Sequence, residues 1–186
     1  MAHSIIISGL PAVGKTTIAR VIADKFNLKH YSGGDVLKEM AIGKGYSLSG
    51  NDWWDTEQGI KFLGERKTNP NFDKQVDEKL VQASNRGGVV ITSYTLPWLA
   101  GDAVKFWLKA SKENRAKRMA KRDNISYDEA LKIVSMRDEE NKKLYFDLYG
   151  IKFGEDLSVF DYVINTDQLD IDGVIDITCT IVKHLI

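Results

Sequence analysis

The pattern G-x-x-x-x-G-K-[ST] at residues 9–16 constrains the fold of this chain more than any other sequence feature. An apolar run over residues 3–8 precedes the pattern and predicts a strand, while residues 17–23 follow it and predict a helix. A strand, a glycine-containing loop and a helix in this order separate a real phosphate-binding loop from a chance match. Such a loop turns backbone N–H groups toward a phosphate, and the positive end of the helix dipole adds to the attraction. The residues predicted to bind a nucleotide are Gly9, Leu10, Pro11, Ala12, Val13, Gly14, Lys15, Thr16 and Thr17.

Two side chains of this loop carry its predicted chemistry. The Lys15 ammonium can reach the β- and γ-phosphates of a nucleoside triphosphate, and the Thr16 hydroxyl can ligate Mg²⁺. Gly9 and Gly14 permit backbone conformations that a side chain would obstruct. ATP and Mg²⁺ are therefore the cofactors that the loop predicts. The three histidines lack metal-ligand spacing, so no other metal site is expected.

The composition predicts a soluble, cytoplasmic protein. A chain of 186 residues is long enough for a proper hydrophobic core, and we expect a single domain over residues 1–186. Lys and Arg together number 26, as do Asp and Glu, and this zero net charge favours neither a nucleic-acid nor a membrane partner. The single cysteine, Cys179, cannot form an internal disulfide, which fits a reducing compartment.

Strand-like and helix-like segments alternate along the rest of the chain. Predicted strands cover residues 28–31, 89–92, 104–108 and 160–164, and predicted helices cover 36–42, 51–68, 71–85, 111–122, 126–149 and 174–185. Alternation of this kind predicts an α/β three-layer sandwich, with a central parallel five-stranded sheet and helices on both faces. Ligands of such sheets bind at the carboxyl ends of the strands, where the phosphate-binding loop also lies.

Several segments together resemble the archaeal type of cytidylate kinase, a P-loop nucleoside-monophosphate kinase family. They read GLPAVGKTT, SGGDVLKEM, VKFWLKASKENRAKRMAKRDNIS, LYGI and FDYVINT, and the resemblance covers most of the chain apart from residues 49–70. The resemblance implies a P-loop kinase fold with an acceptor-binding helical region at about 32–85. It also implies an arginine-rich helical lid, which in this sequence falls at about 111–145.

The arginines of the predicted lid are candidate catalytic residues. Arg115, Arg118 and Arg122 are spaced by three and four residues, so one helix face can carry all three, and Arg137 lies on the next helix. Cations placed here would stabilise the negative charge that spreads over the transferred γ-phosphoryl group. We predict catalytic roles for Arg118, Arg122 and Arg137. A solvated charged face is the alternative, and for Arg115 the two interpretations are evenly matched.

The acceptor half departs from the pattern of the family. The family's third strand usually ends in a Glu-Gly-Arg type segment whose arginine holds the acceptor's phosphate, and residues 92–94 here read Thr-Ser-Tyr. Residues 78–79 are Glu-Lys where paired arginines are usual, and Lys38 replaces another arginine. Trp53 and Trp54 have no counterpart in the family; they line a pocket or cap the edge of a core. Lysine and tyrosine cannot form the pair of hydrogen bonds that an arginine makes with a phosphate group, so a changed acceptor is expected.

An alcohol acceptor would gain from a carboxylate that orients or deprotonates its hydroxyl. Asp35 is the predicted base or orienting residue, with a simple helix-capping role as its alternative. An acceptor that also carries a phosphate needs cations, and Lys38, Arg66 and Lys143 are available. The predicted substrate-binding residues are Lys38, Trp53, Trp54, Tyr94 and Lys143.

These observations predict an ATP-dependent phosphotransferase acting on a small acceptor. The leading acceptor is a phosphorylated alcohol such as mevalonate 3-phosphate, as in a divergent archaeal branch of this P-loop group. The alternative is a nucleoside-monophosphate kinase such as cytidylate kinase, and a further alternative is a nucleotide-dependent switch or binding module. The sequence leaves open the acceptor, the choice between ATP and GTP, and the oligomeric state.

Overall fold

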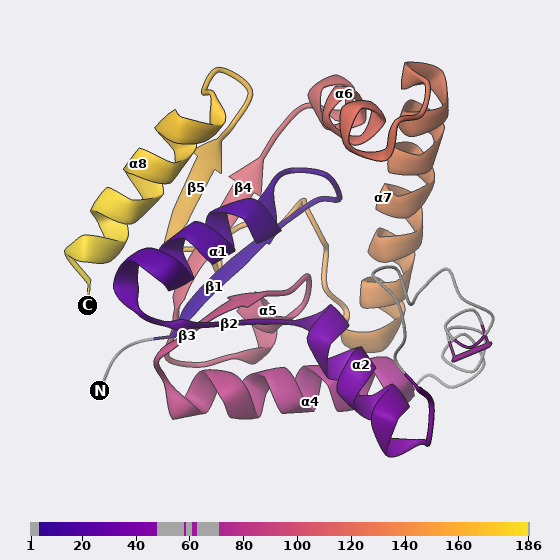
Figure 1. Cartoon of the computed structure of the whole chain (residues 1–186), viewed down its shortest axis with the longest axis vertical. Coiled ribbons are helices and arrows are strands. Elements are labelled where there is room, and N and C mark those ends of the chain that lie inside the picture. The colour runs from indigo at the N-terminus through magenta and orange to yellow at the C-terminus, as the bar shows by residue number, and fades with distance from the viewer. Residues whose placement is uncertain (1–3, 48–57, 59–60, 63–70, 186) are drawn as a thin grey trace.

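The computed structural model describes residues 4–47, 58, 61–62 and 71–185, which form an α/β sandwich around one parallel sheet (Figure 1). The strands are β1 (Ile5–Gly9), β2 (Lys29–Ser32), β3 (Val89–Thr92), β4 (Val104–Lys109) and β5 (Tyr162–Asn165). All are parallel and lie in the order β2-β3-β1-β4-β5, so the strand before the phosphate-binding loop is the central one. The predicted five-stranded parallel sheet is confirmed, and the last strand begins two residues later than predicted.

The described helices cover both faces and one end of the sheet. They are α1 (Lys15–Phe26), α2 (Gly33–Gly43), α4 (Asn71–Arg86), α5 (Leu96–Leu99), α6 (Lys112–Asp123), α7 (Tyr127–Tyr149) and α8 (Ile171–Lys183). The sequence did not predict α5, a four-residue helix with Pro97 near its start. Most of the helix predicted over 51–68 lies outside the described residues.

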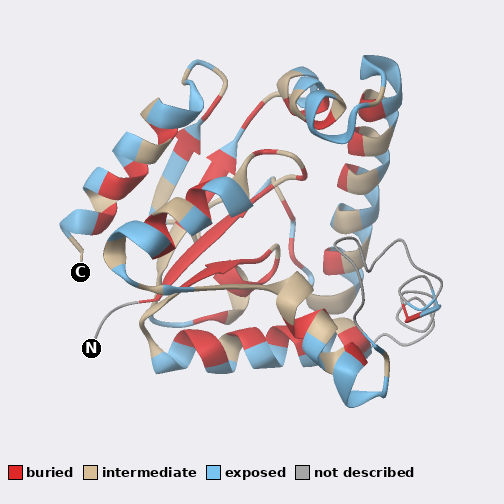
Figure 2. Cartoon of the chain, viewed as in Figure 1, coloured by how far each residue is buried: buried red, intermediate tan, exposed pale blue. Residues whose placement is uncertain are grey.

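Two hydrophobic layers hold the helices against the sheet, because successive side chains of a strand point to opposite faces. Ile5 and Ile7 of β1 pack into the layer that also includes residues of α1 and α8. Ile6, between them, packs into the layer formed with α2 and α4. Every residue of β1 is buried, and Figure 2 shows this strand in red through the middle of the molecule.

Helices α6 and α7 form the region predicted as the lid, and they stand beyond the carboxyl ends of the strands (Figure 1). Serine side chains begin both helices, since Ser111 accepts from the Asn114 N–H and Ser126 accepts from the Glu129 N–H. The two helices pack through a small apolar cluster that includes Ala116, Met119 and Val134. Within the described residues, no helix is both long and apolar enough to cross a membrane.

Candidate active site

The phosphate-binding loop joins β1 to α1 at the carboxyl edge of the sheet. Gly14 has a φ of 103° and Ala12 a φ of 62°, and both values lie in the left-handed region. Gly9 has a φ of 149°, and a Cβ atom there would lie 2.5 Å from the carbonyl oxygen of Leu108. The loop therefore needs glycine at position 9 to pass close to β4, and it holds a non-glycine residue, Ala12, in a costly conformation.

Lys15 is enclosed by the loop and by an aromatic ring. Its ammonium group donates hydrogen bonds to the carbonyl oxygens of Gly9, at 2.8 Å, and Leu10, at 3.0 Å. It also lies 4.5 Å from the centre of the Tyr94 ring. Burial and then the charge of Arg137 lower the pKa of Lys15 to about 7. A triphosphate bound at the loop would restore the charged form, because its oxygens carry the opposite charge.

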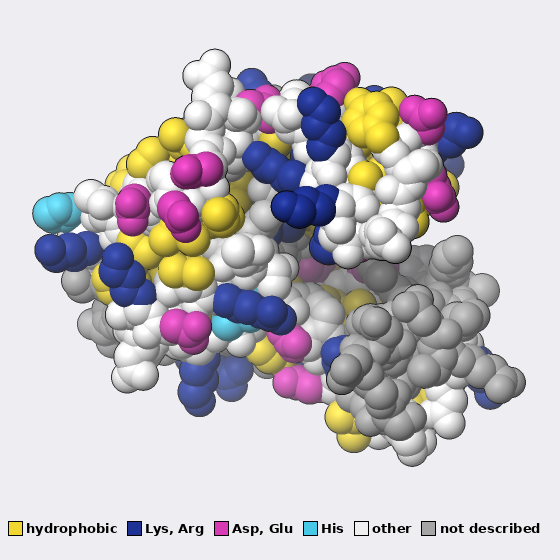
Figure 3. All heavy atoms as spheres, turned by 45° about the horizontal axis from the view of Figure 1, so that its top comes forward, with side chains coloured by type: hydrophobic (Ala, Val, Ile, Leu, Met, Phe, Trp, Pro, Cys, Tyr) yellow, Lys and Arg dark blue, Asp and Glu magenta, His cyan; other side chains and the backbone are white. Residues whose placement is uncertain are grey.

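A cavity of about 760 Å³ opens above the loop and α1, and we call it the donor cavity. Figure 3 shows Lys and Arg side chains gathered near the middle of the corresponding face of the molecule. The residues lining the cavity come from the loop, α1, the segment after β3, α6, α7, the segment before α8 and the start of α8 itself; they include Val13, Gly14, Lys15, Thr16, Arg118, Arg122, Arg137, Thr166, Leu169 and Asp170. Backbone N–H groups and several cations around one cavity suit a nucleoside triphosphate.

A second cavity of about 470 Å³ lies beside the first, and we call it the acceptor cavity. Its lining comes from the start of α2, from α4, from the end of β3 and from α7; it includes Ser32, Gly33, Leu37, Asp73, Asp77, Ser93, Thr95, Asn141 and Tyr145. Four residues line both cavities: Lys15, Thr16, Tyr94 and Arg137. The two cavities therefore meet at a point that is bordered by two cations and a threonine hydroxyl.

The predicted lid arginines occupy different environments. The Arg118 guanidinium donates to the hydroxyl of Thr166 at 2.8 Å and to the carbonyl oxygens of Thr166 and Val13 at 2.7 and 3.3 Å. Arg122 is exposed and pairs with Asp123 at 2.6 Å, although it also lines the donor cavity. Arg137 alone among them borders both cavities, and the catalytic roles of all three stay predictions.

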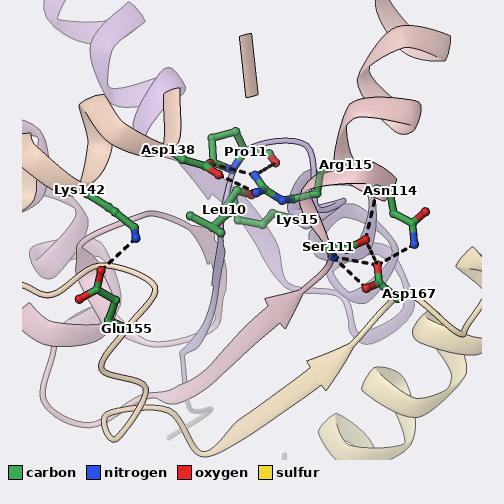
Figure 4. Close-up of polar contacts among 10 residues, drawn as sticks. All are labelled: Leu10, Pro11, Lys15, Ser111, Asn114, Arg115, Asp138, Lys142, Glu155 and Asp167. Carbon is green, nitrogen blue, oxygen red and sulfur yellow. Dashed lines mark hydrogen bonds and ion pairs between the residues drawn. The ribbon is translucent and has the colours of Figure 1, made fainter. Parts of the chain in front are cut away.

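Arg115, for which the sequence left two interpretations open, has neither of the predicted environments. Its side chain is 2% exposed and forms a bidentate ion pair with Asp138 of α7, at 2.9 and 2.6 Å. The same guanidinium donates to the carbonyl oxygen of Pro11 at 3.2 Å (Figure 4). The pair is neither a solvated charged face nor a part of the cavity lining.

Three other predicted residues that the structure describes are not among the lining residues of the two cavities. The Asp35 carboxylate bonds to the Ser32 hydroxyl at 2.6 Å, and the Asp35 N–H donates to the same hydroxyl at 3.2 Å. Ser32 is therefore the residue that caps α2, while Asp35 lies in the first turn of the helix and does not line either described cavity. The role of Asp35 as a base or orienting residue stays a prediction. Lys38 of α2 and the exposed Lys143 of α7 are likewise not among the lining residues. Trp53, Trp54 and Arg66 lie outside the described residues.

Asp77, which was not predicted from the sequence, is a buried carboxylate in the wall of the acceptor cavity. It accepts hydrogen bonds from the Thr95 hydroxyl at 2.5 Å and from the Tyr149 hydroxyl at 2.7 Å. Burial, followed by the bond to Asp77, raises the pKa of Tyr149. The sequence feature that could have identified this residue is an aspartate on the apolar face of α4, where residues 72, 76, 80 and 83 are also buried.

Thr16 is the residue of the described chain best placed to hold Mg²⁺ with a nucleotide. It is exposed at the start of α1, next to Lys15, and it lines both cavities. No group of three or more His, Cys, Asp or Glu residues suited to a metal occurs in the described part of the chain. The residues therefore fit a metal ion that arrives with its phosphate ligand rather than one held by a carboxylate cage.

The fold and the site define a P-loop small-molecule kinase. The chain belongs to the cytidylate kinase-like family, whose family model matches residues 4–168. It is 36% identical to the cytidylate kinase of Pyrococcus horikoshii over 182 residues, which cover 97% of this chain and 88% of that protein. It is also 36% identical to the cytidylate kinase of Methanocaldococcus jannaschii over 186 residues, with 97% and 98% of the two chains covered.

A comparison with solved structures supports the fold independently of the sequence relatives. A gluconokinase from Sinorhizobium meliloti matches with a TM-score of 0.56 and 15% identity, covering 98% of this chain and 93% of that one. The expected acceptor, mevalonate 3-phosphate, finds no support in the family or in these relatives, and their names favour the alternative, a nucleoside-monophosphate kinase.

Proposed function

We propose that this protein transfers the γ-phosphoryl group of ATP to a nucleoside monophosphate, with CMP as the first candidate. The observation that carries the proposal is the meeting of the donor and acceptor cavities at Lys15, Thr16, Tyr94 and Arg137. Membership of the cytidylate kinase-like family and the names of its relatives support CMP over other acceptors.

Phosphoryl transfer to a phosphate acceptor requires cations at fixed positions more than it requires a general base. An oxygen of the acceptor phosphate attacks the γ-phosphorus, the bond to the β,γ-bridging oxygen breaks, and ADP leaves. The acceptor phosphate is already anionic at neutral pH, so no side chain has to remove a proton from it. Lys15 and Arg137 border the point of transfer and would stabilise the charge on the equatorial oxygens. Mg²⁺, held by Thr16 and the nucleotide, would neutralise part of the phosphate charge.

The contacts of Arg118 tie it to the phosphate-binding loop and to Thr166 rather than to the point where the two cavities meet. Its guanidinium is tied to Thr166 and to the Val13 carbonyl, on the side where Leu169 and Asp170 line the cavity. We therefore assign Arg118 to the loop and the nucleoside part of ATP, and Arg137 to the transfer itself.

The acceptor cavity has features that would recognise a cytosine base. Asp77 is fixed in the wall by Thr95 and Tyr149, and a carboxylate accepts hydrogen bonds only. The exocyclic amino group of cytosine is a donor, whereas uracil has a carbonyl oxygen at the same position. A cytosine near Asp77 would therefore be favoured over uracil.

A phosphorylated alcohol remains the second candidate because of two observations in the acceptor cavity. Tyr94 stands where the resemblance leads one to expect an arginine, and a buried carboxylate, Asp77, lies in the cavity wall. A hydroxyl acceptor would use a carboxylate in the cavity wall, and Asp77 meets that need better than Asp35.

The test is ADP release from Mg·ATP across a panel of CMP, UMP, AMP, shikimate and mevalonate 3-phosphate. We expect turnover with CMP that exceeds turnover with UMP, and we expect Lys15→Met to abolish both. Turnover with mevalonate 3-phosphate alone would reject the nucleotide proposal and select the second candidate. ADP release that is independent of any acceptor would reject both and favour a nucleotide switch.

A further inference from the structure

The Arg115–Asp138 ion pair is a buried charged group that the proposed transfer chemistry does not use. Arg115 belongs to α6, Asp138 to α7 and their shared neighbour Pro11 to the phosphate-binding loop, so three segments meet at one guanidinium (Figure 4). Replacing a buried ion pair by well-packed apolar side chains often leaves stability unchanged or improves it. Stability alone is therefore a weak reason for a pair at this position, and its geometry points to a second role.

The bond from Arg115 to Pro11 fixes the direction of a backbone donor in the loop. In a trans peptide the C=O and the N–H point in opposite directions. A guanidinium that holds the Pro11 carbonyl oxygen, at 3.2 Å, therefore also sets the direction of the Ala12 N–H. Ala12 has a φ of 62°, a conformation that persists only where the surroundings impose it. Arg115 supplies that constraint from outside the loop.

Arg118 repeats the arrangement one helical turn further along α6. It donates to the Val13 carbonyl oxygen at 3.3 Å and so sets the direction of the Gly14 N–H. Helix α6 is itself anchored, because the Asp167 carboxylate accepts from the Ser111 N–H and from the Asn114 side chain, both near 2.9 Å (Figure 4). The helix is therefore a fixed support from which two arginines hold two loop carbonyls.

We propose that Arg115 and Asp138 are positioning residues that align the Ala12 N–H of the phosphate-binding loop for the bound nucleotide. Asp138 keeps the Arg115 guanidinium in place. The guanidinium in turn fixes the Pro11 carbonyl oxygen, and with it the direction of the Ala12 N–H. Asp138 directly follows Arg137, so the same turn of α7 also carries the cation at the point of transfer. The inference rests on the P-loop kinase class and not on the identity of the acceptor.

The experiment separates positioning from stability by comparing single and double variants. Asp138→Leu leaves the Arg115 charge buried without its partner, and we expect its Tm to fall by about 10 °C. The double variant Arg115→Met with Asp138→Leu removes both charges, and its Tm should return close to that of the wild type. We expect the double variant to bind Mg·ADP at least tenfold more weakly in calorimetry, because the Pro11 carbonyl has lost its donor. ADP binding needs no acceptor, so this result is independent of the proposed substrate.

Amide signals in ¹H–¹⁵N spectra of the Mg·ADP complex give a more specific readout. We expect the double variant to shift the Ala12 signal strongly and the Gly14 signal little, since Arg118 still holds Val13. Arg115→Lys keeps the charge but replaces a bidentate guanidinium by a single ammonium group, so its Tm should fall less than that of Asp138→Leu and its ADP affinity should fall at least threefold. Lys117→Met, at an exposed position of α6, is the matched control and should change neither quantity.

Wild-type ADP affinity in the double variant, together with an unshifted Ala12 amide, would overturn the proposal and leave the pair with a purely structural role. If the double variant did not fold, the same decision would rest on Arg115→Lys, where unchanged ADP affinity would overturn it.

Discussion

Nucleotide binding should draw a proton onto Lys15 at mildly alkaline pH. Burial and the nearby Arg137 lower the pKa of this ammonium group to about 7 in the free protein. At pH 8, about nine-tenths of the lysine is therefore neutral before a ligand binds. The phosphates of a bound nucleotide favour the charged form and raise the pKa well above 8. Binding at pH 8 should then take up about 0.9 protons per site, against about 0.1 at pH 6.

The uptake can be measured by titrating a non-hydrolysable ATP analogue, with Mg²⁺, in buffers of different ionisation enthalpy. The slope of the observed binding enthalpy against the buffer enthalpy gives the number of protons taken up. Lys15→Met is the control, because it removes the titrating group and leaves the contributions of all others. The affinity of the wild type should also fall about tenfold per pH unit above pH 7. Equal uptake in the wild type and in Lys15→Met at pH 8 would mean that Lys15 does not gain a proton when the nucleotide binds.

Three further predictions follow from the contacts of the site. The free energy of unfolding of the wild type, relative to Lys15→Met, should rise by up to about 1.4 kcal/mol per pH unit between pH 7 and 10, because the unfolded state then binds more protons than the folded state. This difference is measured by urea denaturation at several pH values. Arg137→Met should lower kcat about 10²–10³-fold in a steady-state assay, because Arg137 borders the point of transfer, while Lys132→Met on the exposed side of α7 should not. Asp167→Ala should lower the free energy of unfolding by about 1–2 kcal/mol in urea denaturation, because Ser111 and Asn114 lose their acceptor.

Each of these predictions has a result that contradicts it. A stability difference between the wild type and Lys15→Met that stays flat from pH 7 to 10 would mean that the lysine is not perturbed in the free protein. Similar kcat values for the variants of Arg137 and Lys132 would remove Arg137 from the point of transfer. An Asp167→Ala protein as stable as the wild type would show that α6 does not depend on this anchor.

The sheet and the phosphate-binding loop could be predicted because their signals are local. The loop pattern spans residues 9–16, and β1 and β3 are short apolar runs between polar turns, whereas β2 reads Lys-His-Tyr-Ser. Helix α5 escaped prediction because four residues carry no periodicity. Strand β5 was placed two residues early because Phe160, which packs against the Trp107 cluster just before the strand begins, is also apolar.

The roles of individual arginines could not be predicted because they depend on tertiary contacts. Arg115 and Arg118 are three residues apart on one helix and look alike in the sequence. Only the fold brings Asp138, 23 residues away, against Arg115, and Thr166, 48 residues away, against Arg118. Asp77 was missed for the same reason, since its partner Tyr149 lies 72 residues further along the chain.

The proposed transfer of a phosphoryl group from ATP to CMP can be followed with a radioactive label. The protein is incubated with [γ-³²P]ATP, Mg²⁺ and CMP, and the nucleotides are separated by chromatography. We expect the label to appear in CDP with the wild type and to stay in ATP with Lys15→Met. Label that appears in inorganic phosphate, or that stays in ATP with the wild type, would contradict the assignment of CMP as the acceptor.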